Sequence, residues 1–288
     1  MALPAIAPYP LPSADELPAN RVNWTVDPAR AVLLVHDLQQ HFLSAFPAGA
    51  QPLTGLLAHT ARLTQAARGL GVPVVYSVQR GGQSPQERGL QLDFWGPGVA
   101  DDPVALAVPA AVAPQPGDTV LTKWKYSAFV RTELAELLRS TGRDQLVVTG
   151  VYAHIGVLMS ACDAWMRDIR AFVVADAVAD FSRADHDMAL RWAAGRCAFV
   201  TTTDALLGEL AAAPLTLERI RADVADVLGE DPVDVPVDEN LLDLGMDSVR
   251  IMTLLERWRR EHAVTADFAD LAERPAVEAW AALLGATA

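Results

Sequence analysis

The chain has 288 residues, of which 51% are hydrophobic and 20% charged, and its formal net charge is −13. Nucleic acid is not expected as a partner, because phosphate contacts require Lys and Arg clusters that an acidic chain of this kind lacks. No apolar run approaches the roughly 20 residues of a membrane span, no secretory signal is evident, and two cysteines give neither a disulfide framework nor a metal spacing. A cytoplasmic protein without membrane association is expected.

The acidic residues are unevenly distributed along the chain. Residues 216–288 hold 16 Asp and Glu against 7 Lys and Arg, a net charge of −9, which leaves −4 for residues 1–215. At roughly 100–200 residues per domain, the chain is long enough for two domains. A charge difference of this kind is typical of a separate module with its own partners.

Apolar runs alternate with segments of helical spacing over the first part of the chain. Residues 1–30 contain six prolines and predict an extended N-terminal arm. Continuous apolar runs predict buried strands at residues 31–35, 72–78, 119–122, 146–150, 171–175 and 199–203. The prediction is an α/β domain over residues 1–210, with a mostly parallel six-stranded sheet that helices cover on both faces in three Rossmann-like layers.

The alternation stops at residues 211–215, which are predicted to be a linker. An apolar stripe from Leu217 to Leu228 predicts a helix, a second helix is expected to begin near Ser248, and the last helix follows Pro275. Residues 216–288 are therefore predicted to form a small all-α domain, a bundle of four helices.

Three features fall at the carboxyl ends of predicted strands. Asp37 follows the first strand, Lys123 the third, and a helix-opening loop, Gly150 to Gly156, the fourth. Because the carboxyl ends of parallel strands share one edge of the sheet, an acid, a cation and a helix N-terminus can converge there on a small anion. Taken singly, Asp37 is equally a loop-capping carboxylate, and Lys123 an ordinary surface lysine.

Five segments in chain order resemble the isochorismatases of the cysteine-hydrolase superfamily, and the likeness covers roughly residues 3–210. The segments are residues 35–42 (VHDLQQHF), 94–98 (FWGPG), 121–129 (LTKWKYSAF), 150–156 (GVYAHIG) and 179–183 (ADFSR). In the wider superfamily an Asp, a Lys and a Cys form the site, and these positions correspond here to Asp37, Lys123 and Gly156. Because glycine offers no nucleophile, covalent acyl transfer is excluded.

The resemblance implies hydrolysis of a vinyl ether, in which isochorismate and water give 2,3-dihydro-2,3-dihydroxybenzoate and pyruvate. It implies that Asp37 is the general acid, that Lys123 orients this acid or holds a substrate oxygen, and that the missing side chain of Gly156 leaves space for a ring-bearing dicarboxylate. Substrate contacts are implied for Gln79, Arg88, Trp95, Tyr126, Tyr152 and Ile155, with a surface arginine as the alternative for Arg88. No metal-ligand pattern follows the catalytic strand, so no catalytic metal is predicted.

A second resemblance lies in the acidic module. Residues 240–250 (NLLDLGMDSVR) resemble the signature of acyl and aryl carrier proteins, which implies a 4'-phosphopantetheine arm on Ser248. The alternative is that Ser248 only caps a helix. Both likenesses in this order are similar to the bifunctional isochorismatase and aryl carrier proteins of catechol siderophore assembly, whose carrier domain holds 2,3-dihydroxybenzoate as a thioester.

The implied partners are isochorismate, a phosphopantetheinyl transferase, a 2,3-dihydroxybenzoate-AMP ligase and the condensation domain of a nonribosomal peptide synthetase. A homodimer or larger homo-oligomer is also expected. Two other functions stay open: a phenazine-type hydrolase acting on 2-amino-2-deoxyisochorismate, and a carrier or docking scaffold whose hydrolase domain is inactive.

Overall fold

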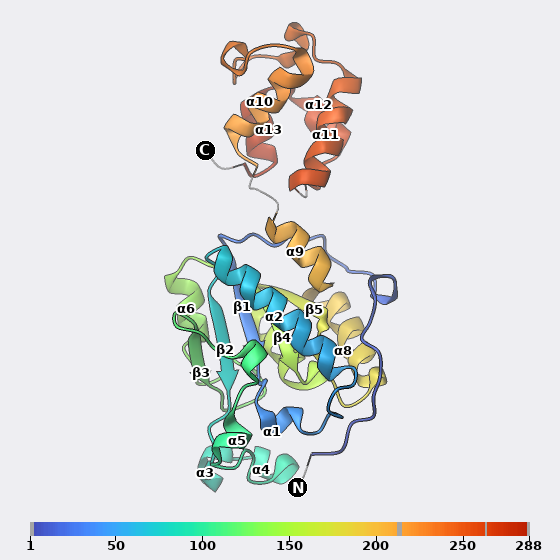
Figure 1. Ribbon diagram of the computed structural model, residues 1–288. Coiled ribbons are helices and arrows are strands. Elements are labelled where there is room, and N and C mark those ends of the chain that lie inside the picture. Colours follow the sequence, from blue (N-terminus) through green and yellow to red (C-terminus); the bar gives the residue numbers. More distant parts are fainter. Residues whose placement is uncertain (1–2, 212–214, 263, 287–288) are drawn as a thin grey trace. The chain divides into compact units, whose positions relative to one another are not determined.

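The computed structural model describes residues 3–211, 215–262 and 264–286 (Figure 1). The chain divides into two compact units, residues 1–207 and 208–288. Most of the predicted linker at 211–215 lies outside the described residues. None of the described helices is both long and apolar enough to cross a membrane.

A six-stranded sheet of order β3-β2-β1-β4-β5-β6 organises the first unit, and each of its five strand pairs is parallel. Its strands are β1 (Ala31–His36), β2 (Val74–Val78), β3 (Thr119–Thr122), β4 (Gln145–Val151), β5 (Arg170–Ala179) and β6 (Ala198–Thr201). The central strands β1 and β4 are buried along their whole length, which explains their continuous apolar runs. Strand order reverses between these two, and folds of this type hold ligands at the carboxyl ends of such a pair.

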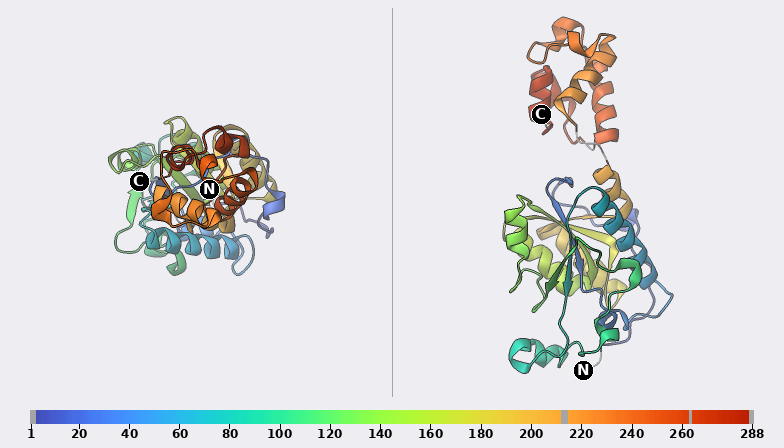
Figure 2. Two further views of the ribbon diagram at one scale, coloured as in Figure 1. Left: turned by 90° about the horizontal axis from the view of Figure 1, so that it is seen from above. Right: turned by 60° about the vertical axis from the view of Figure 1, so that its left-hand side comes forward.

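Helices cover both faces of this sheet, as the right-hand view of Figure 2 shows. On one face lies α2 (Leu53–Gly69), whose Leu56 and Leu63 are buried. The opposite face is covered by α6 (Leu134–Ser140), α7 (Leu158–Trp165) and α8 (Arg183–Arg196), whose apolar side chains share one core cluster with β1, β4 and β5. The predicted three-layer α/β fold is confirmed.

Short helices gather near the carboxyl ends of β1 and β2 (Figure 1). They are α1 (Gln40–Leu43), α3 (Pro85–Arg88), α4 (Gln91–Trp95) and α5 (Pro103–Leu106), with one 3-10 turn, η2 (Ala110–Val112), further on. Ser84 caps α3 through its hydroxyl, which accepts from the Glu87 N–H, and Pro85 occupies the first helical position. Helix α9 (Thr203–Ala211) spans the boundary between the two units at residues 207 and 208.

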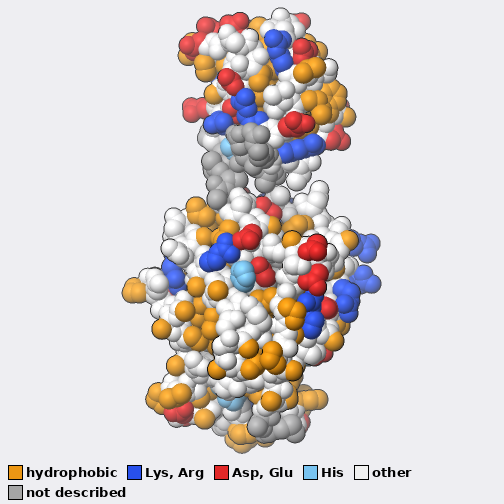
Figure 3. Space-filling model, turned by 45° about the vertical axis from the view of Figure 1, so that its right-hand side comes forward, with side chains coloured by type: hydrophobic (Ala, Val, Ile, Leu, Met, Phe, Trp, Pro, Cys, Tyr) orange, Lys and Arg blue, Asp and Glu red, His pale blue; other side chains and the backbone are white. Residues whose placement is uncertain are grey.

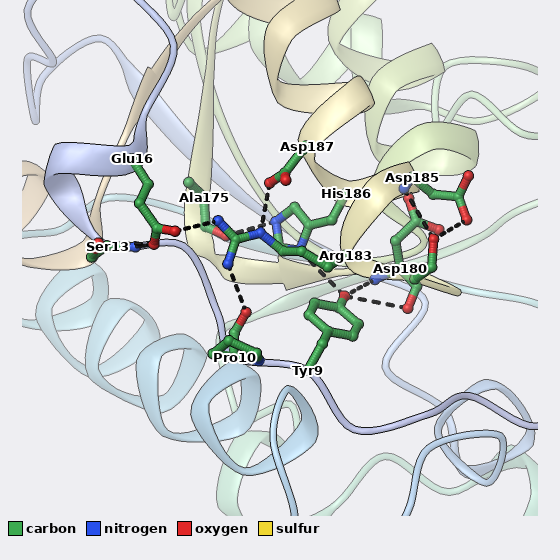
Figure 4. A network of polar contacts seen from close by, with 11 residues as sticks. Tyr9, Pro10, Ser13, Glu16, Ala175, Asp180, Arg183, Asp185, His186 and Asp187 are labelled. Atoms are coloured by element: carbon green, nitrogen blue, oxygen red, sulfur yellow. Dashed lines mark hydrogen bonds and ion pairs between the residues drawn. The ribbon is translucent and has the colours of Figure 1, made fainter.

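The N-terminal arm lies along the first unit and contains one short turn, η1 (Ala14–Glu16). Tyr9 is buried, and its hydroxyl accepts from the Asp180 N–H at 2.7 Å and lies 3.2 Å from His186 Nδ1. Arg183 holds the arm from α8, donating to the Glu16 carboxylate at 2.8 Å and to the Pro10 carbonyl at 3.2 Å (Figure 4). The arm is thus tied to the end of β5 and the start of α8.

The segment after Gly150 differs from the sequence-based expectation. The predicted helix was expected to open at Gly156, whereas residues Ala153–Val157 form a π-helical turn, η3, and α7 begins only at Leu158. Backbone N–H groups of Ile155 and Val157 both donate to the Tyr152 carbonyl in this turn. Gly156 therefore stands inside a wide turn rather than at a regular helix start.

The second unit contains α10 (Leu217–Leu228), α11 (Ser248–His262), α12 (Phe268–Glu273) and α13 (Val277–Leu283), with two 3-10 turns, η4 (Pro232–Asp234) and η5 (Leu241–Leu244). The predicted four-helix domain is confirmed. Its core is centred on Trp258 and Trp280, whose rings meet edge to face with centroids 5.8 Å apart. The Trp258 indole N–H donates to the buried Asp223 carboxylate at 2.8 Å, so the largest core side chain leaves no polar atom unpaired.

Acidic and basic side chains are interspersed on the face of each unit that Figure 3 shows. Arg62 and Asp204, for example, form an exposed ion pair at 2.6 Å. Exposed pairs of this kind contribute at most about 1 kcal/mol each. The folded state of each unit therefore depends mainly on its apolar core.

Candidate active site

A pocket lies at the carboxyl ends of β1 to β4, and all nine residues predicted for the hydrolase site line it. They are Asp37, Gln79, Arg88, Trp95, Lys123, Tyr126, Tyr152, Ile155 and Gly156. His36, His41, Phe42 and Gln91 also line this pocket, and reasoning from the sequence missed them. The structure thus brings together residues that are up to 119 positions apart in the chain, although the role of each residue stays a prediction.

Asp37 lies directly after β1 in a left-handed backbone conformation, with φ of 53°. Among residues with a side chain, Asp is one of those that best tolerate this region, and residues in such conformations cluster at functional sites. Its side chain is buried, and both carboxylate oxygens have donors. Oδ1 accepts from the Ser77 hydroxyl at 3.0 Å, and Oδ2 accepts from Gln79 Nε2 at 3.3 Å.

Lys123 is buried beside this carboxylate, so it is not a surface lysine. Its Nζ lies 2.9 Å from Asp37 Oδ2 and also donates to the Lys125 carbonyl at 2.7 Å. The second contact fixes the ammonium in place. The pair has no net charge when both groups are ionised, so an anion in this pocket needs a further cation.

Arg88 supplies that cation. The residue is only 2% exposed, which excludes the surface-arginine alternative, and its guanidinium donates to the Gly96 carbonyl and to Gln79 Oε1 at 3.2 and 3.3 Å. Among the described residues, no carboxylate lies within ion-pair distance of it. Burial lowers the pKa of Arg88. A buried cation without a counter-ion is costly in free energy, and an anionic ligand would offset this cost.

Aromatic side chains form one wall of the pocket. The Trp95 indole N–H donates to the Tyr126 hydroxyl at 2.7 Å. Phe181 stacks on Tyr152 with ring centroids 4.2 Å apart, and it also lies beside Trp95 at 6.2 Å. The Tyr152 hydroxyl donates to the Phe42 carbonyl, and burial raises the pKa of Tyr152, so this phenol stays neutral. The wall can therefore face an unsaturated ring without adding charge.

Asp180 fixes the turn that carries Ile155 and Gly156. Its carboxylate accepts from the His154 backbone N–H at 2.6 Å and lies 2.7 Å from Nδ1 of the same histidine. This hydrogen bond raises the pKa of His154. Because Phe181 follows Asp180 directly, one buried carboxylate positions both the turn and the aromatic stack.

His36 occupies the volume that the sequence suggested would be free. A Cβ on Gly156 would stand 2.1 Å from Cε1 and 2.7 Å from Nε2 of the His36 ring. The absent side chain therefore does not leave open space, because the imidazole is already there. His36 follows an apolar run, so nothing in the sequence distinguished it from the end of a buried strand.

No cluster of His, Cys, Asp or Glu side chains that could hold a metal ion occurs in the part of the chain that the structure describes. Cys162 lies on α7 and is not among the residues that line the pocket. The charged side chains that line the pocket include Asp37, Lys123 and Arg88.

In the second unit, Ser248 is exposed at the first position of α11. The helix cap is the preceding residue, because Asp247 Oδ1 accepts from the Arg250 N–H at 2.9 Å. Asp247 therefore caps α11, which was the alternative role considered for Ser248. Exposed apolar side chains adjoin it in sequence, among them Leu242, Val249 and Met252. An exposed hydroxyl at a helix N-terminus fits the attachment of a phosphodiester-linked arm.

Comparison with protein families finds two matches in the chain. Residues 31–205 match the isochorismatase domain, and residues 218–284 match the phosphopantetheine attachment site. Both matches fall on segments where the resemblance had placed the corresponding function.

Individual proteins similar to this chain agree with these two family matches. The chain is 52% identical to the isochorismatase of Bacillus subtilis, with 99% of this chain and 96% of that protein covered. It is 43% identical to enterobactin synthase component B of Escherichia coli, with 99% and 98% covered. Phenazine biosynthesis protein PhzD of Pseudomonas fluorescens is 51% identical, but the match covers 70% of this chain and 97% of that protein. Among solved structures, a cysteine hydrolase from Pseudomonas syringae is similar with a TM-score of 0.59 at 25% identity, covering 66% of this chain and 95% of that one.

Proposed function

The chain belongs to the isochorismatase family, and from this premise we propose that it hydrolyses isochorismate to 2,3-dihydro-2,3-dihydroxybenzoate and pyruvate. We propose further that its second unit carries 2,3-dihydroxybenzoate as a thioester in the assembly of a catechol siderophore. The observation that carries the proposal is that similarity to the isochorismatase and to enterobactin synthase component B runs through both units. A cytoplasmic location and a homo-oligomeric state belong to the same proposal.

The charges of the pocket support a dicarboxylate substrate. Arg88 is a buried guanidinium without a carboxylate partner among the described residues, and its planar edge suits a carboxylate. The aromatic wall of Tyr126, Tyr152 and Trp95 suits the cyclohexadiene ring.

Asp37 is the proposed acid. It would deliver a proton to the methylene carbon of the enol ether, water would add to the resulting oxocarbenium ion, and the hemiketal would collapse to pyruvate and the ring alcohol. The acid must hold its proton when substrate is bound. The two substrate carboxylates favour the neutral acid, whereas the Lys123 ammonium at 2.9 Å favours the carboxylate. We therefore assign Lys123 to orienting Asp37 and holding a substrate oxygen, and no covalent nucleophile takes part.

Ser248 is the proposed attachment site of 4'-phosphopantetheine, which supplies the thiol that carries the acyl group. A phosphopantetheinyl transferase would modify it, a 2,3-dihydroxybenzoate-AMP ligase would load it, and a condensation domain of a nonribosomal peptide synthetase would unload it. The exposed Leu242, Val249 and Met252 beside the serine are the proposed contacts for these enzymes.

A phenazine-type hydrolase is the second candidate. The relative PhzD has the same hydrolase region at 51% identity, but the match ends before the carrier unit. A chain that retains a carrier unit has a use for an aryl acid on a thioester, which favours isochorismate over its 2-amino analogue. A scaffold with an inactive hydrolase domain is disfavoured by the buried Asp37–Lys123 pair and the unpaired Arg88.

One experiment separates these functions. Purified full-length protein is incubated with isochorismate or 2-amino-2-deoxyisochorismate while pyruvate is measured, and its intact mass is determined before and after treatment with a phosphopantetheinyl transferase and coenzyme A. We expect pyruvate release with preference for isochorismate, and one added arm that Ser248→Ala abolishes. Arm attachment without pyruvate release would indicate a carrier scaffold with an inactive hydrolase domain. Preference for 2-amino-2-deoxyisochorismate would indicate the phenazine-type enzyme.

A further inference from the structure

His36 is buried between two segments that contribute tyrosines to the aromatic wall of the pocket. Its Nδ1 lies 2.9 Å from the Val151 carbonyl at the end of β4, and its Nε2 lies 3.3 Å from the Tyr126 carbonyl in the segment after β3. Burial lowers the pKa of His36, so the ring is neutral and its one N–H belongs to the shorter contact, with Val151. Both partners are carbonyl oxygens, so the neutral ring donates to the Val151 carbonyl at the end of β4 and only packs against the Tyr126 carbonyl.

Two glycines make room for this histidine. Gly150 pairs with His36 across β1 and β4, and a Cβ at Gly150 would stand 2.0 Å from the His36 carbonyl oxygen. A Cβ at Gly156 would stand 2.1, 2.7 and 3.0 Å from three atoms of its ring. A Cβ does not approach other atoms so closely, so glycine at 150 makes room for the backbone of His36 and glycine at 156 makes room for its ring.

We propose that His36 is a positioning residue that ties the end of β4 to β1 through its hydrogen bond to Val151, and that its imidazole occupies the volume that any side chain at position 156 would need. Glycine is then required at position 156 because the His36 ring occupies the adjoining volume, and not only because a substrate needs space. The positioning part of this proposal concerns the KM for substrate and rests on the proposed function. The volume part concerns the space at position 156 and is independent of any substrate.

The volume part is tested by a double-mutant cycle on the full-length protein, with Gly156→Ala, His36→Ala and the two combined. We expect Gly156→Ala to lower the melting temperature of the first unit by about 5 °C, as overpacking of a core does. The added His36→Ala should then raise the melting temperature above that of Gly156→Ala alone, although His36→Ala by itself lowers it.

Additive effects in this cycle would overturn the proposal, and so would a Gly156→Ala protein as stable as the wild type. If Gly156→Ala does not fold, the combined variant should still fold. Failure of both to fold would also contradict the proposal, because alanine at 156 would then be excluded by something other than His36.

The positioning part is tested by comparing His36→Asn with His36→Leu. The Asn side chain can donate to the Val151 carbonyl as Nδ1 does, whereas Leu keeps volume but has no donor. We expect the KM for isochorismate to rise about tenfold more in His36→Leu than in His36→Asn, as expected for a lost hydrogen bond. Equal KM values in two variants of equal melting temperature would refute the tie. If the wild type released no pyruvate, the proposed function would fail, while the melting temperatures would still decide the volume part.

Discussion

The two units present the groups proposed to react in opposite ways. In the first unit Asp37, Lys123 and Arg88 are buried, and the contacts that orient them are made before any ligand arrives. In the second unit Ser248 is exposed, and the buried Asp223 carboxylate accepts from the Trp258 indole in the core. Chemistry inside a pocket depends on partners arranged in advance, whereas a covalent carrier needs an accessible hydroxyl and a folded support. Substitutions should therefore affect one function at a time.

Among the substitutions that test this contrast between the two units, Asp37→Asn is expected to have the largest effect. Asp37→Asn removes the proposed acid, so pyruvate release from isochorismate should fall by about 10²- to 10⁴-fold. Attachment of the arm to Ser248, measured by intact mass, should be unchanged. Asp101→Asn, an exposed acid, is the control. Wild-type turnover in Asp37→Asn would remove Asp37 from the mechanism.

The next largest effect is expected at Asp223 in the second unit. This carboxylate accepts from the Trp258 indole and pairs with Arg219 and Arg257 at 3.0 and 3.3 Å. Asp223→Ala removes the carboxylate that these three side chains contact, and it should destabilise the carrier unit by about 3–5 kcal/mol. Urea unfolding should show this loss, arm attachment should weaken, and pyruvate release should stay at the wild-type rate.

Asp226→Ala is the matched control, because Asp226 is exposed and, among the described residues, pairs with Arg257 alone, at 2.8 Å. It should cost at most about 1 kcal/mol. If Asp223→Ala slowed pyruvate release as much as it weakened arm attachment, the two units would not be independent.

Arg88→Met separates binding from stability inside the first unit. Loss of hydrogen bonds to a charged group should raise the KM for isochorismate about 10- to 100-fold. Because the substitution also removes a buried cation that has no carboxylate partner in the described part of the chain, the melting temperature should not fall. Arg80→Met is the control, since Arg80 is exposed and pairs with Glu87 at 3.4 Å. A large fall in melting temperature with an unchanged KM would mean that Arg88 serves only the fold.

A smaller effect concerns pH and the histidine behind the N-terminal arm. Burial lowers the pKa of His186 to about 4, against roughly 6.5 in an unfolded chain. Between these values the unfolded state binds more protons, so stability is fully present above about pH 6.5 and is lost as the pH falls toward 4. Between pH 7 and pH 5 the loss should be on the order of 2 kcal/mol.

His186→Gln should flatten this dependence in urea unfolding of the full-length protein at the two pH values. His154→Gln is the control with the opposite sign, because Asp180 raises the pKa of His154. The contribution of His154 is present below its unfolded pKa and is lost as the pH rises through its folded pKa. A wild-type pH profile in His186→Gln would assign the acid sensitivity to other groups.

The smallest effects distinguish Asp247 from Ser248. Asp247→Ala removes the cap of α11 and should destabilise the carrier unit by about 1 kcal/mol. Ser248→Ala should leave thermal stability unchanged while preventing arm attachment altogether. Equal loss of stability in both variants would mean that the serine is also needed for the cap.

Much of the first unit could be predicted because its central strands are buried on both faces and read as continuous apolar runs. The extension of β5 beyond Ala175 could not, since Asp176 interrupts the run. That carboxylate is buried, and it accepts from the backbone N–H and hydroxyl of Thr203 at 2.8 Å. The helices α3 to α5 are four or five residues long, too short to establish a period.

The site was predictable where topology alone brings residues together, as for Asp37 and Lys123. His36 and Ser77 were missed because their importance depends on partners that only the folded chain reveals: backbone carbonyls for His36, and the Asp37 carboxylate for Ser77. Ser248 was predictable from ten neighbouring residues, since a carrier site is local in sequence. The relation between Gly156 and His36 joins positions 120 residues apart.

That relation has a consequence for how sites of this fold diverge. A change from Gly156 to cysteine would place the new Cβ 2.1 Å from a ring atom of His36, so the step that adds a thiol should also destabilise the first unit. Replacing His36 first would remove its hydrogen bond to Val151 before any new chemistry exists. Either order of the two changes therefore passes through a protein weakened at the pocket, which favours the retention of glycine at position 156.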